Sequence, residues 1–496
     1  MKKLLFVLGV LFVYTASAQD QKFRKIYGGT SYDYGMDVVQ LPDSGYLLLG
    51  TSSSFSGSSD IYLLRVDKYG NFKWHHVYGN NNVEWGYSLK ATRDSGFVVA
   101  GYTNSMGNGG YDFYLMKVDS IGTKLWEKTY GGSDWEFGYS IDTTSDGGYI
   151  LTGSTLSYGK GNTDVYIVKT NAVGDTLWTK TMGGTGDDVG RSVVQSRFDS
   201  TYAICGYTNS FGSSMHDVYI IHLKNNGDTI MSKHFGTADE DFGRCIIFSN
   251  DSAFAIAGYS NGYLGASDFS GILWKLYINM NQQWMEYPGQ AFADDIMNDL
   301  WQRPDFDSCY VTAGETSFNN YDFAIYEIDK NGYFAFANTH GNLGVDKSNA
   351  FVHCLDGGFA QIGTSTSYAT GLENILFLKS DSLFASSPNP IVFLFQQEEA
   401  MMAADNSVYP NPFYQQTKIQ SNVPYFTAVN EKLQFVVYSI SGQNVTSQIN
   451  YYMQEFDGKL LVNINENELS QGIYFYSLLT NSHTIASGKL VVLTTE

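Results

Sequence analysis

Acidic side chains recur along this chain every 51 to 53 residues, each shortly before a run of alternating apolar residues: Asp33, Glu84, Glu136, Asp188 and Asp241. Such carboxylates, with nearby Ser, Asn, Tyr and Gly, could bind calcium or sugar hydroxyls. An acid present in nearly every unit is more simply a structural residue that accepts backbone N–H bonds and holds a glycine-rich turn. The pattern therefore favours a scaffold role, with calcium a possible cofactor and no other cofactor predicted.

The remaining candidates for catalysis do not form a catalytic constellation. Residues Gly258 to Gly262 have the G-x-S-x-G spacing of a nucleophile elbow, which requires a strand, a sharp turn and a helix. The segments 101–105 and 206–210 align with it, so we interpret it as a turn of a repeat. The eight histidines show no HExxH spacing, and the sequence identifies no metal ligands. No catalytic residue is predicted, and a non-enzymatic protein is favoured over an enzyme.

The four cysteines do not suggest a disulfide framework. Cys205, Cys245, Cys309 and Cys354 are few for a chain of this length, and no CxxC pair occurs. Cys205 aligns with small or apolar residues of sister units, such as Ala100. We therefore predict buried, unbridged thiols rather than disulfide bridges.

The elements that must position these side chains belong to a unit of about 52 residues that recurs seven times between Lys22 and roughly Phe384. Each unit contains four short runs rich in β-branched and aromatic residues, bounded by Gly, Asn, Asp and Ser, without a helical period. The run from Asp164 to Lys169 is apolar on both faces, as in a sheet that is covered on both sides. The second run ends at a glycine in every unit: Gly50, Gly101, Gly153, Gly206, Gly258, Gly314 and Gly363. This periodicity predicts an all-β fold, a seven-bladed β-propeller with four strands per blade, over residues 19–387.

The order of the runs predicts how the ring closes. A large apolar residue marks the fourth run of each unit, and the first such marker, Phe23, precedes the first glycine anchor. We therefore expect Lys22 to Tyr27 to pair beside the run from Ile375 to Lys379 and to complete the last blade. The alternative is that Ile391 to Gln397 fills this position.

Binding residues are sought where the later units depart from the consensus. Asp294, Asp295 and Trp301 have weak counterparts in the sister units and are the candidates for a one-sided binding patch. The alternative explanation is neutral drift in these later units, which the sequence favours over binding at these positions.

The N-terminal residues and the charge limit the possible locations and partners. Residues 1–18 carry Lys2 and Lys3, an apolar stretch and a small-residue site ending at Ala18, as in a secretory signal peptide. The apolar stretch is too short to predict a transmembrane span. The formal charge of −20 argues against nucleic acid as a partner, because phosphate groups would be repelled.

After a linker at residues 388–404, residues 405–496 contain no copy of the repeat and read as a small immunoglobulin-like β-sandwich. Four motifs occur in order, and their main residues are Tyr409, Pro410, Asn411, Pro412, Gly442, Gly472 and Tyr474, followed by a terminal Gly-Lys-Leu-Val-Val segment. This segment resembles the type A C-terminal sorting domain of the type IX secretion system of Bacteroidota. The repeats resemble those of secreted seven-bladed propellers, a family without a settled activity.

These resemblances imply a protein that the type IX machinery exports across both membranes to the cell surface or the medium. Within that frame the sequence favours a binding module for an unknown extracellular glycan or protein. The alternatives are a secreted polysaccharide-active enzyme, which would need two suitably spaced carboxylates, and a structural or adhesive surface protein without a discrete ligand site.

Overall fold

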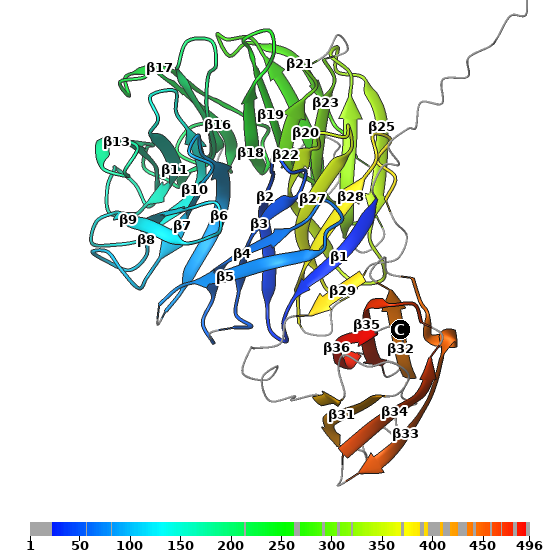
Figure 1. The fold of residues 1–496 in the computed structure, drawn as a ribbon. Helices are drawn as coiled ribbons and strands as arrows, with labels where there is room; N and C mark the ends of the chain where they lie inside the picture. Colours follow the sequence, from blue (N-terminus) through cyan, green and yellow to red (C-terminus); the bar gives the residue numbers. More distant parts are fainter. Residues whose placement is uncertain are drawn as a thin grey trace, which may run out of the picture. The chain divides into compact units, whose positions relative to one another are not determined.

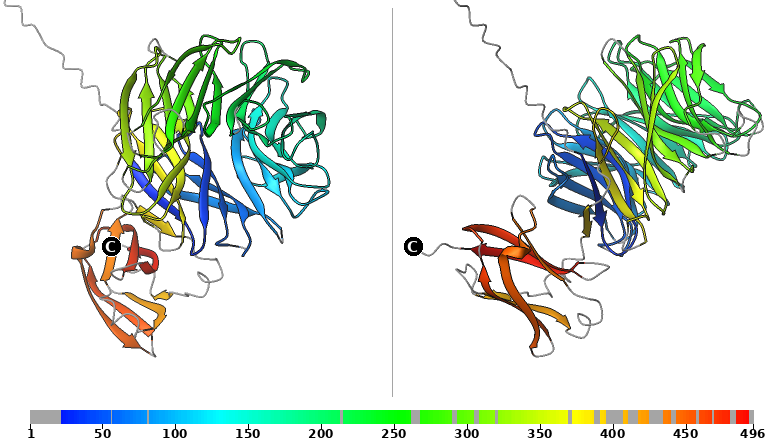
Figure 2. Two further views of the ribbon diagram at one scale, coloured as in Figure 1. Left: turned by 180° about the vertical axis from the view of Figure 1, so that it is seen from behind. Right: turned by 90° about the vertical axis from the view of Figure 1, so that its right-hand side faces the viewer.

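The computed structural model describes residues 22–492 except residues 56, 81, 213–214, 262–267, 290–292, 305–307, 319–320, 369–371, 387–390, 395–406, 410–416, 425–433, 440–442, 457–458, 468 and 480–483. The chain forms two compact units, which divide after Leu394. The first unit is a ring of seven β-sheets around a central axis (Figures 1 and 2). The predicted seven-bladed propeller is confirmed.

Every blade is an antiparallel meander whose first strand lies innermost. The innermost strands of blades 1 to 7 are β2 (Asp33–Gln40), β6 (Glu84–Ala91), β10 (Glu136–Thr143), β14 (Asp188–Gln195), β18 (Asp241–Phe248), β22 (Asp295–Gln302) and β26 (Asp346–His353). The second strands are β3 (Tyr46–Ser52), β7 (Phe97–Thr103), β11 (Tyr149–Thr155), β15 (Tyr202–Thr208), β19 (Phe254–Ser260), β23 (Tyr310–Thr316) and β27 (Phe359–Ser365). The third strands are β4 (Asp60–Val66), β8 (Asp112–Val118), β12 (Asp164–Thr170), β16 (Asp217–Leu223), β20 (Ser270–Leu276), β24 (Asp322–Ile328) and β28 (Asn374–Ser380). The outermost strands of blades 1 to 6 are β5 (Phe72–Tyr78), β9 (Lys124–Tyr130), β13 (Thr176–Met182), β17 (Thr229–Phe235), β21 (Gln282–Glu286) and β25 (Phe334–His340).

Burial follows the position of a strand in its blade. All seven residues of β12 are buried, as its two apolar faces predicted, whereas residues of the outermost β13 alternate between exposed and half-buried. The core lies between blades: Phe113 of β8 packs with Leu151 of β11 and Tyr166 of β12 in one cluster. Each blade therefore buries its faces only against its neighbours, as expected for a repeat architecture.

A buried cation of the third strand anchors the turn between the first two strands. Lys169 is 1% exposed, and its ammonium lies 2.9 Å from the carboxylate of Asp146 in that turn. Gly147, the next residue of the turn, has φ of +85°, which glycine adopts without strain. Four further pairs repeat this arrangement: Arg65–Asp43, Lys117–Asp94, Lys275–Asp251 and Lys379–Asp356. In five blades the turn between the first two strands is thus held by an ion pair within the blade.

The N-terminal strand closes the ring. β1 (Phe23–Gly28) pairs antiparallel with β28, with Phe23 opposite Lys379 and Tyr27 opposite Ile375, so the predicted closure is confirmed. The alternative segment takes another place, because β29 (Ile391–Leu394) pairs parallel with the outer edge of β1 as a fifth strand (Figure 1). The first unit consequently extends to Leu394, beyond the end predicted at residue 387.

The second unit, residues 395–496, contains two antiparallel sheets. One has the strand order β30 (Ser407–Tyr409), β31 (Thr417–Pro424), β34 (Lys459–Asn467) and β33 (Ile449–Phe456). The other has the order β32 (Gln434–Ser439), β35 (Gly472–Leu479) and β36 (Thr484–Val492), and a 3₁₀ turn lies at Thr446–Gln448. Val437, Val462 and Leu490 share one buried cluster, so side chains of both sheets form the core.

Candidate functional site

Each innermost strand carries a β-bulge at its fourth residue. The pairing of β10 with β11 skips Tyr139, and the pairing of β14 with β15 skips Arg191 in the same way. A bulge leaves its extra residue out of the ladder and turns its side chain in a new direction. The bulge residues of blades 1 to 7 are Met36, Tyr87, Tyr139, Arg191, Arg244, Asn298 and Asn349. We call these seven side chains the bulge ring.

The bulge ring is chemically asymmetric. In blades 6 and 7 its asparagines are committed to the scaffold: Asn298 Nδ2 donates to Ser348 O at 2.9 Å, and Asn349 Nδ2 donates to Gly35 O at 2.7 Å. Blades 2 to 5 instead supply two tyrosines followed by two arginines. The polar groups available to a ligand are therefore concentrated on one half of the ring.

In blades 1, 3, 4 and 6 the residue after the bulge helps to hold the ring together. An innermost strand is the edge of its sheet, so the N–H groups on its unpaired side need partners from the next blade. Asp37 Oδ2 accepts from Leu89 N at 2.7 Å, and Asp299 Oδ2 accepts from Phe351 N at 3.0 Å. Ser140 and Ser192 accept equivalent bonds from Val193 N and Ile246 N at 3.2 and 3.3 Å. These bonds tie neighbouring blades together at the axis.

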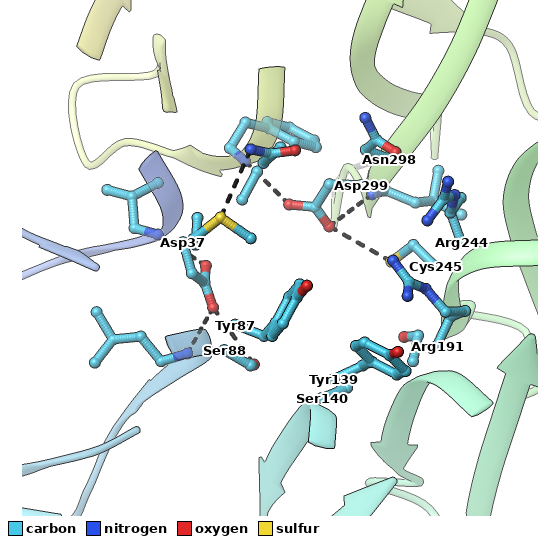
Figure 3. Close-up of a pocket in the computed structure, with 18 of the residues that line it drawn as sticks. Asp37, Tyr87, Ser88, Tyr139, Ser140, Arg191, Arg244, Cys245, Asn298 and Asp299 are labelled. Carbon is cyan, nitrogen blue, oxygen red and sulfur yellow. Dashed lines mark hydrogen bonds between the residues drawn. The ribbon is translucent and has the colours of Figure 1, made fainter. Parts of the chain in front are cut away.

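The bulge ring surrounds a cavity of about 690 Å³ along the axis of the propeller (Figure 3). Its lining extends from Lys347 near the start of the innermost strands to His353 at their end. This volume falls within the range of small-molecule sites in proteins. The cavity is the candidate functional site.

Arg191 and Arg244 lie side by side in this cavity (Figure 3). The guanidinium of Arg191 lies 4.2 Å from the ring centre of Tyr139, and Arg244 donates to the hydroxyl of Tyr259 at 3.1 Å. Within the described part of the chain neither arginine has a carboxylate within ion-pairing distance. Burial, and then repulsion from Arg244, lowers the pKa of Arg191. Glu315 lines the same cavity, and the charge of Arg244 opposes the rise that burial causes in the pKa of Glu315. This half of the ring therefore holds positive charge that no ion pair among the described residues neutralises.

Other charges of the cavity lining are compensated. Burial alone would lower the pKa of Lys90, but the carboxylates of Asp37, Asp142 and Asp299 outweigh it and raise that pKa. Burial raises the pKa of Asp37 to about 6, although Lys90 and two backbone N–H groups oppose this rise. The cavity thus carries the two arginines of blades 4 and 5 together with Lys90, whose charge is compensated by carboxylates of blades 1, 3 and 6.

The recurrent acids are structural. Glu136 is fully buried; its Oε2 accepts from Gly132 N at 2.8 Å and its Oε1 from Thr155 Oγ1 at 2.6 Å. A side chain on Gly131 would lie within 2.3 Å of the carboxylates of both Asp112 and Glu136, which explains the glycine of the Tyr-Gly-Gly turn. Backbone N–H bonds of the same kind reach Asp33, Glu84, Asp188, Asp241 and Asp346. The predicted scaffold role is confirmed.

The three residues predicted to form a binding patch have different environments. Asp295 is the first residue of β22 and aligns with Asp241 and Asp346, so its classification as a departure from the repeat was wrong. It is 1% exposed, and its carboxylate accepts from Tyr326 Oη at 2.9 Å. Asp294 precedes it and accepts from Phe269 N at 2.9 Å and from Tyr321 Oη at 2.6 Å, which links two loops.

Trp301, the third predicted residue, lines the cavity. Its ring stacks on that of His353 at a centroid distance of 4.3 Å and an interplanar angle of 13°. The structure therefore brings Trp301 to the candidate site and leaves Asp294 and Asp295 among the loop and scaffold contacts.

The predicted serine motif and the cysteines occupy ordinary positions of the repeat. Ser260, the central residue of the G-x-S-x-G segment, is a buried residue at the end of β19 opposite Asp241, as expected for a repeat position. All four cysteines are free, as predicted. Within the described residues no group of three or more His, Cys, Asp or Glu side chains could hold a metal ion, and no helix is long and apolar enough to cross a membrane.

The predicted sorting residues lie in the second unit. Tyr409 ends β30, Gly472 begins β35, and Tyr474 is 7% exposed with its hydroxyl donating to Ser470 O at 2.9 Å. Pro410, Asn411, Pro412 and Gly442 lie outside the described residues, as does the predicted signal peptide at residues 1–18.

The bulge ring was not predicted, although a recurrent glycine of the innermost strands marks most of its positions in the sequence. In five blades the residue before the bulge is glycine, for example Gly138 before Tyr139 and Gly190 before Arg191. The bulge position differs in chemistry between the blades, with Met, Tyr, Arg and Asn side chains. Aligning the units on this glycine would have placed the two tyrosines and the two arginines next to one another in the ring.

Comparisons with known proteins identify the second unit. Residues 407–493 match the family described as a secretion system C-terminal sorting domain, which confirms the predicted type IX sorting domain. This domain indicates export to the cell surface or secretion. The regulatory protein FlaEY of Caulobacter vibrioides is 25% identical over 202 residues, which is 35% of this chain and 21% of that protein.

Solved structures with a similar fold include an ulvan lyase described as a new family of polysaccharide lyase. Its TM-score is 0.47 at 10% identity, covering 71% of this chain and 96% of that one. Sqt1 from Chaetomium thermophilum has a TM-score of 0.42 at 11% identity, covering 70% and 82% of the two chains. At this identity the similarity is one of fold and does not extend to activity.

Proposed function

We propose that the propeller is an extracellular binding module whose ligand places an anionic group in the axial cavity, between Arg191 and Arg244. The observation that supports it is the absence of an ion-paired carboxylate for either arginine among the described residues. Two like charges held together in a partly buried site are unfavourable unless an anion compensates them. The chain has a formal charge of −20, so an uncompensated cationic pair is unusual for its composition.

The chemistry of the two arginines defines the kind of group that would bind. Guanidinium groups present planar, paired donors that match the oxygens of a carboxylate or sulfate. Tyr87 and Tyr139 add hydroxyl groups and aromatic faces beside them. A glycan or protein ligand that carries such an anion fits the cavity, and the type IX domain would deliver the module to the place where extracellular ligands are found.

Calorimetric titration of the purified chain with sodium glucuronate and sodium sulfate tests this function. We expect binding that Arg191→Gln or Arg244→Gln weakens at least tenfold, about 1.4 kcal/mol. Arg197→Gln is the matched control, because Arg197 is exposed and bonds to Asn250 in a surface turn. Equal binding by all three variants, or no binding of either anion by the unmodified chain, would contradict the proposal.

The alternative of a polysaccharide-active enzyme can be tested on the same protein. New reducing ends or unsaturated sugar products from an acidic polysaccharide would favour catalysis over binding. Loss of those products in Asp294→Asn or Asp295→Asn, with an unchanged thermal unfolding midpoint, would identify the carboxylates responsible, because both side chains also make structural hydrogen bonds.

A further inference from the structure

A continuous set of aromatic rings runs across blades 1 to 3 at the end of the propeller where the innermost strands begin. Neighbouring ring centres lie 6.1 Å apart for Tyr32 and Tyr34, 5.2 Å for Tyr34 and Trp85, and 6.3 Å for Trp85 and Tyr102. The set continues from Tyr102 through Phe137 and Tyr111 to Trp135 at spacings of 5.0, 5.4 and 5.7 Å. We call these seven residues the aromatic track: Tyr32, Tyr34, Trp85, Tyr102, Tyr111, Phe137 and Trp135.

The repeat fixes the central positions of the track. Trp85 and Phe137 are the second residues of their innermost strands, and Tyr102 pairs with Trp85 across the ladder. The two ends of the track are exposed, at 41% for Tyr32 and 48% for Trp135, and the rings between them are half-buried. A contiguous set of aromatic rings that is exposed at both ends and half-buried between them is a candidate binding surface, because exposed rings on a soluble protein are usually isolated.

The track leads to the arginine pair of the cavity. The Trp85 ring lies 6.1 Å from that of Tyr87, and Tyr87 lies 5.1 Å from Tyr139. Tyr139 in turn carries the guanidinium of Arg191 at 4.2 Å. An unbroken series of ring contacts therefore joins an exposed surface to the cationic half of the bulge ring.

We propose that the ligand is an acidic glycan whose sugar rings lie on the aromatic track while a carboxylate or sulfate substituent enters the cavity. This inference rests on the proposed function, because it takes the arginine pair as the anion site. A pyranose ring has an apolar C–H face that packs on an aromatic face, and hydroxyl groups that remain in water. An acidic sugar is the chemical class that combines such faces with a discrete anion.

Electrostatics restrict this class further. The chain is strongly acidic, so a densely charged polymer such as nucleic acid would be repelled from most of its surface. A chain of mainly neutral sugars with spaced acidic residues avoids this repulsion and still supplies one anion to Arg191 and Arg244. An acidic peptide would satisfy the arginines but lacks the apolar C–H faces with which sugar rings pack on aromatic side chains.

The decisive experiment compares a monomer with an oligomer on the same protein. Calorimetry separates the contributions of the anion and of the aromatic track when four ligands are compared. These are glucuronate and three oligosaccharides of equal length, one containing glucuronate, one sulfated and one neutral. We expect an acidic oligosaccharide to bind at least tenfold more tightly than glucuronate, and the neutral one to bind at least tenfold more weakly than the acidic one. Comparison of the uronate and sulfate arms shows which anion the cavity prefers.

Variants separate the two levels of the proposal. Trp135→Ala should weaken oligosaccharide binding at least fivefold and leave glucuronate binding unchanged, whereas Arg191→Gln should weaken both. Tyr333→Ala, which removes a 71% exposed ring outside the track, is the control and should change neither. If glucuronate binding depends on the arginines but the acidic oligosaccharide binds no more tightly than glucuronate, the glycan inference alone is overturned. An acidic peptide that binds more tightly than the acidic oligosaccharide has the same consequence. Loss of arginine dependence for every ligand overturns the proposed function as well.

Discussion

The guanidinium of Arg191 lies 4.2 Å from the centre of the Tyr139 ring, and both residues occupy bulge positions of adjacent blades. The same local irregularity, repeated in every blade, thus brings together two side chains that lie 52 residues apart in the sequence. The blade supplies a fixed backbone, and the identity of one residue per blade decides what the axis of the ring presents. Binding chemistry can therefore change at these positions without altering the fold.

Replacing Arg191 should improve stability while removing binding. An unpaired, partly buried charge beside Arg244 costs more than the roughly 0.5–1 kcal/mol that its contact with Tyr139 returns. We expect Arg191→Gln to raise the free energy of unfolding by about 1 kcal/mol, measured by urea denaturation without ligand. Arg197→Gln should leave it unchanged within about 0.5 kcal/mol. A destabilised Arg191→Gln protein would show that the arginine contributes to the fold rather than to a ligand site.

The closing strand should determine the stability of the whole ring. Phe23 is 7% exposed, and its ring lies 5.3 Å from that of Phe377 and 6.3 Å from that of Tyr46, which belong to the two blades that meet at the closure. Phe23→Ala should therefore lower the free energy of unfolding by about 3–4 kcal/mol, as for other large cavities in cores. The control is Phe334→Ala, since Phe334 is 49% exposed on another outermost strand. Similar losses in both variants, measured by thermal denaturation, would contradict a special role for β1.

Much of this fold could be predicted because each blade repeats the same constraints. The glycine in each second strand and the acid at the start of each innermost strand have fixed structural partners, so their spacing identified the register, and the position of Phe23 relative to this register identified the closing strand. The position of β29 could not be derived, because pairing with the outer edge of β1 requires no motif in a four-residue strand.

The candidate site was harder to predict because its residues lack the constraints that repeat in every blade. A bulge residue makes no ladder contact, so Tyr87, Tyr139, Arg191 and Arg244 vary freely and resemble drift in a single sequence. Asp295 was misjudged because it follows the preceding acid by 54 residues rather than 51 to 53, which hid its alignment with Asp241. Departure from a repeat identifies a site only when the position also faces a cavity.

Calcium should have little effect on the propeller if the recurrent acids serve only the scaffold. The oxygens of Glu136 accept bonds from Gly132 N and Thr155 Oγ1, which leaves them poorly placed to coordinate a cation. A site filled at one hundred times its Kd would add about 2.7 kcal/mol to stability. We expect the thermal midpoints measured in calcium and in EGTA to differ by far less than the shift that about 2.7 kcal/mol of added stability would produce. A clear rise in calcium that Glu136→Gln abolishes would instead assign these acids to a metal site.

His340 should make the closing region sensitive to acid. This residue is 5% exposed, Ser386 Oγ lies 3.1 Å from its Nδ1, and burial, followed by repulsion from Arg24, lowers its pKa to about 4. The unfolded chain, in which histidine has a pKa near 6.5, therefore binds a proton first as the pH falls. The stability that neutral His340 contributes is complete above about pH 6.5 and is lost progressively down to about pH 4, by about 3 kcal/mol in total.

Denaturant unfolding between these pH values, compared with His340→Gln, tests this expectation. The comparison removes the contributions of other titrating groups. One of these is Asp322, whose pKa is raised to about 6 by burial and by Asp346. Protonation of Asp322 stabilises the fold as the pH falls. The difference in stability between the unmodified protein and His340→Gln should shrink or reverse towards pH 4. His76→Gln, which removes an exposed imidazole, should keep the pH dependence of the unmodified protein. A constant difference between the unmodified protein and His340→Gln would mean that His340 titrates alike in the folded and unfolded chains, which is incompatible with its burial beside Arg24.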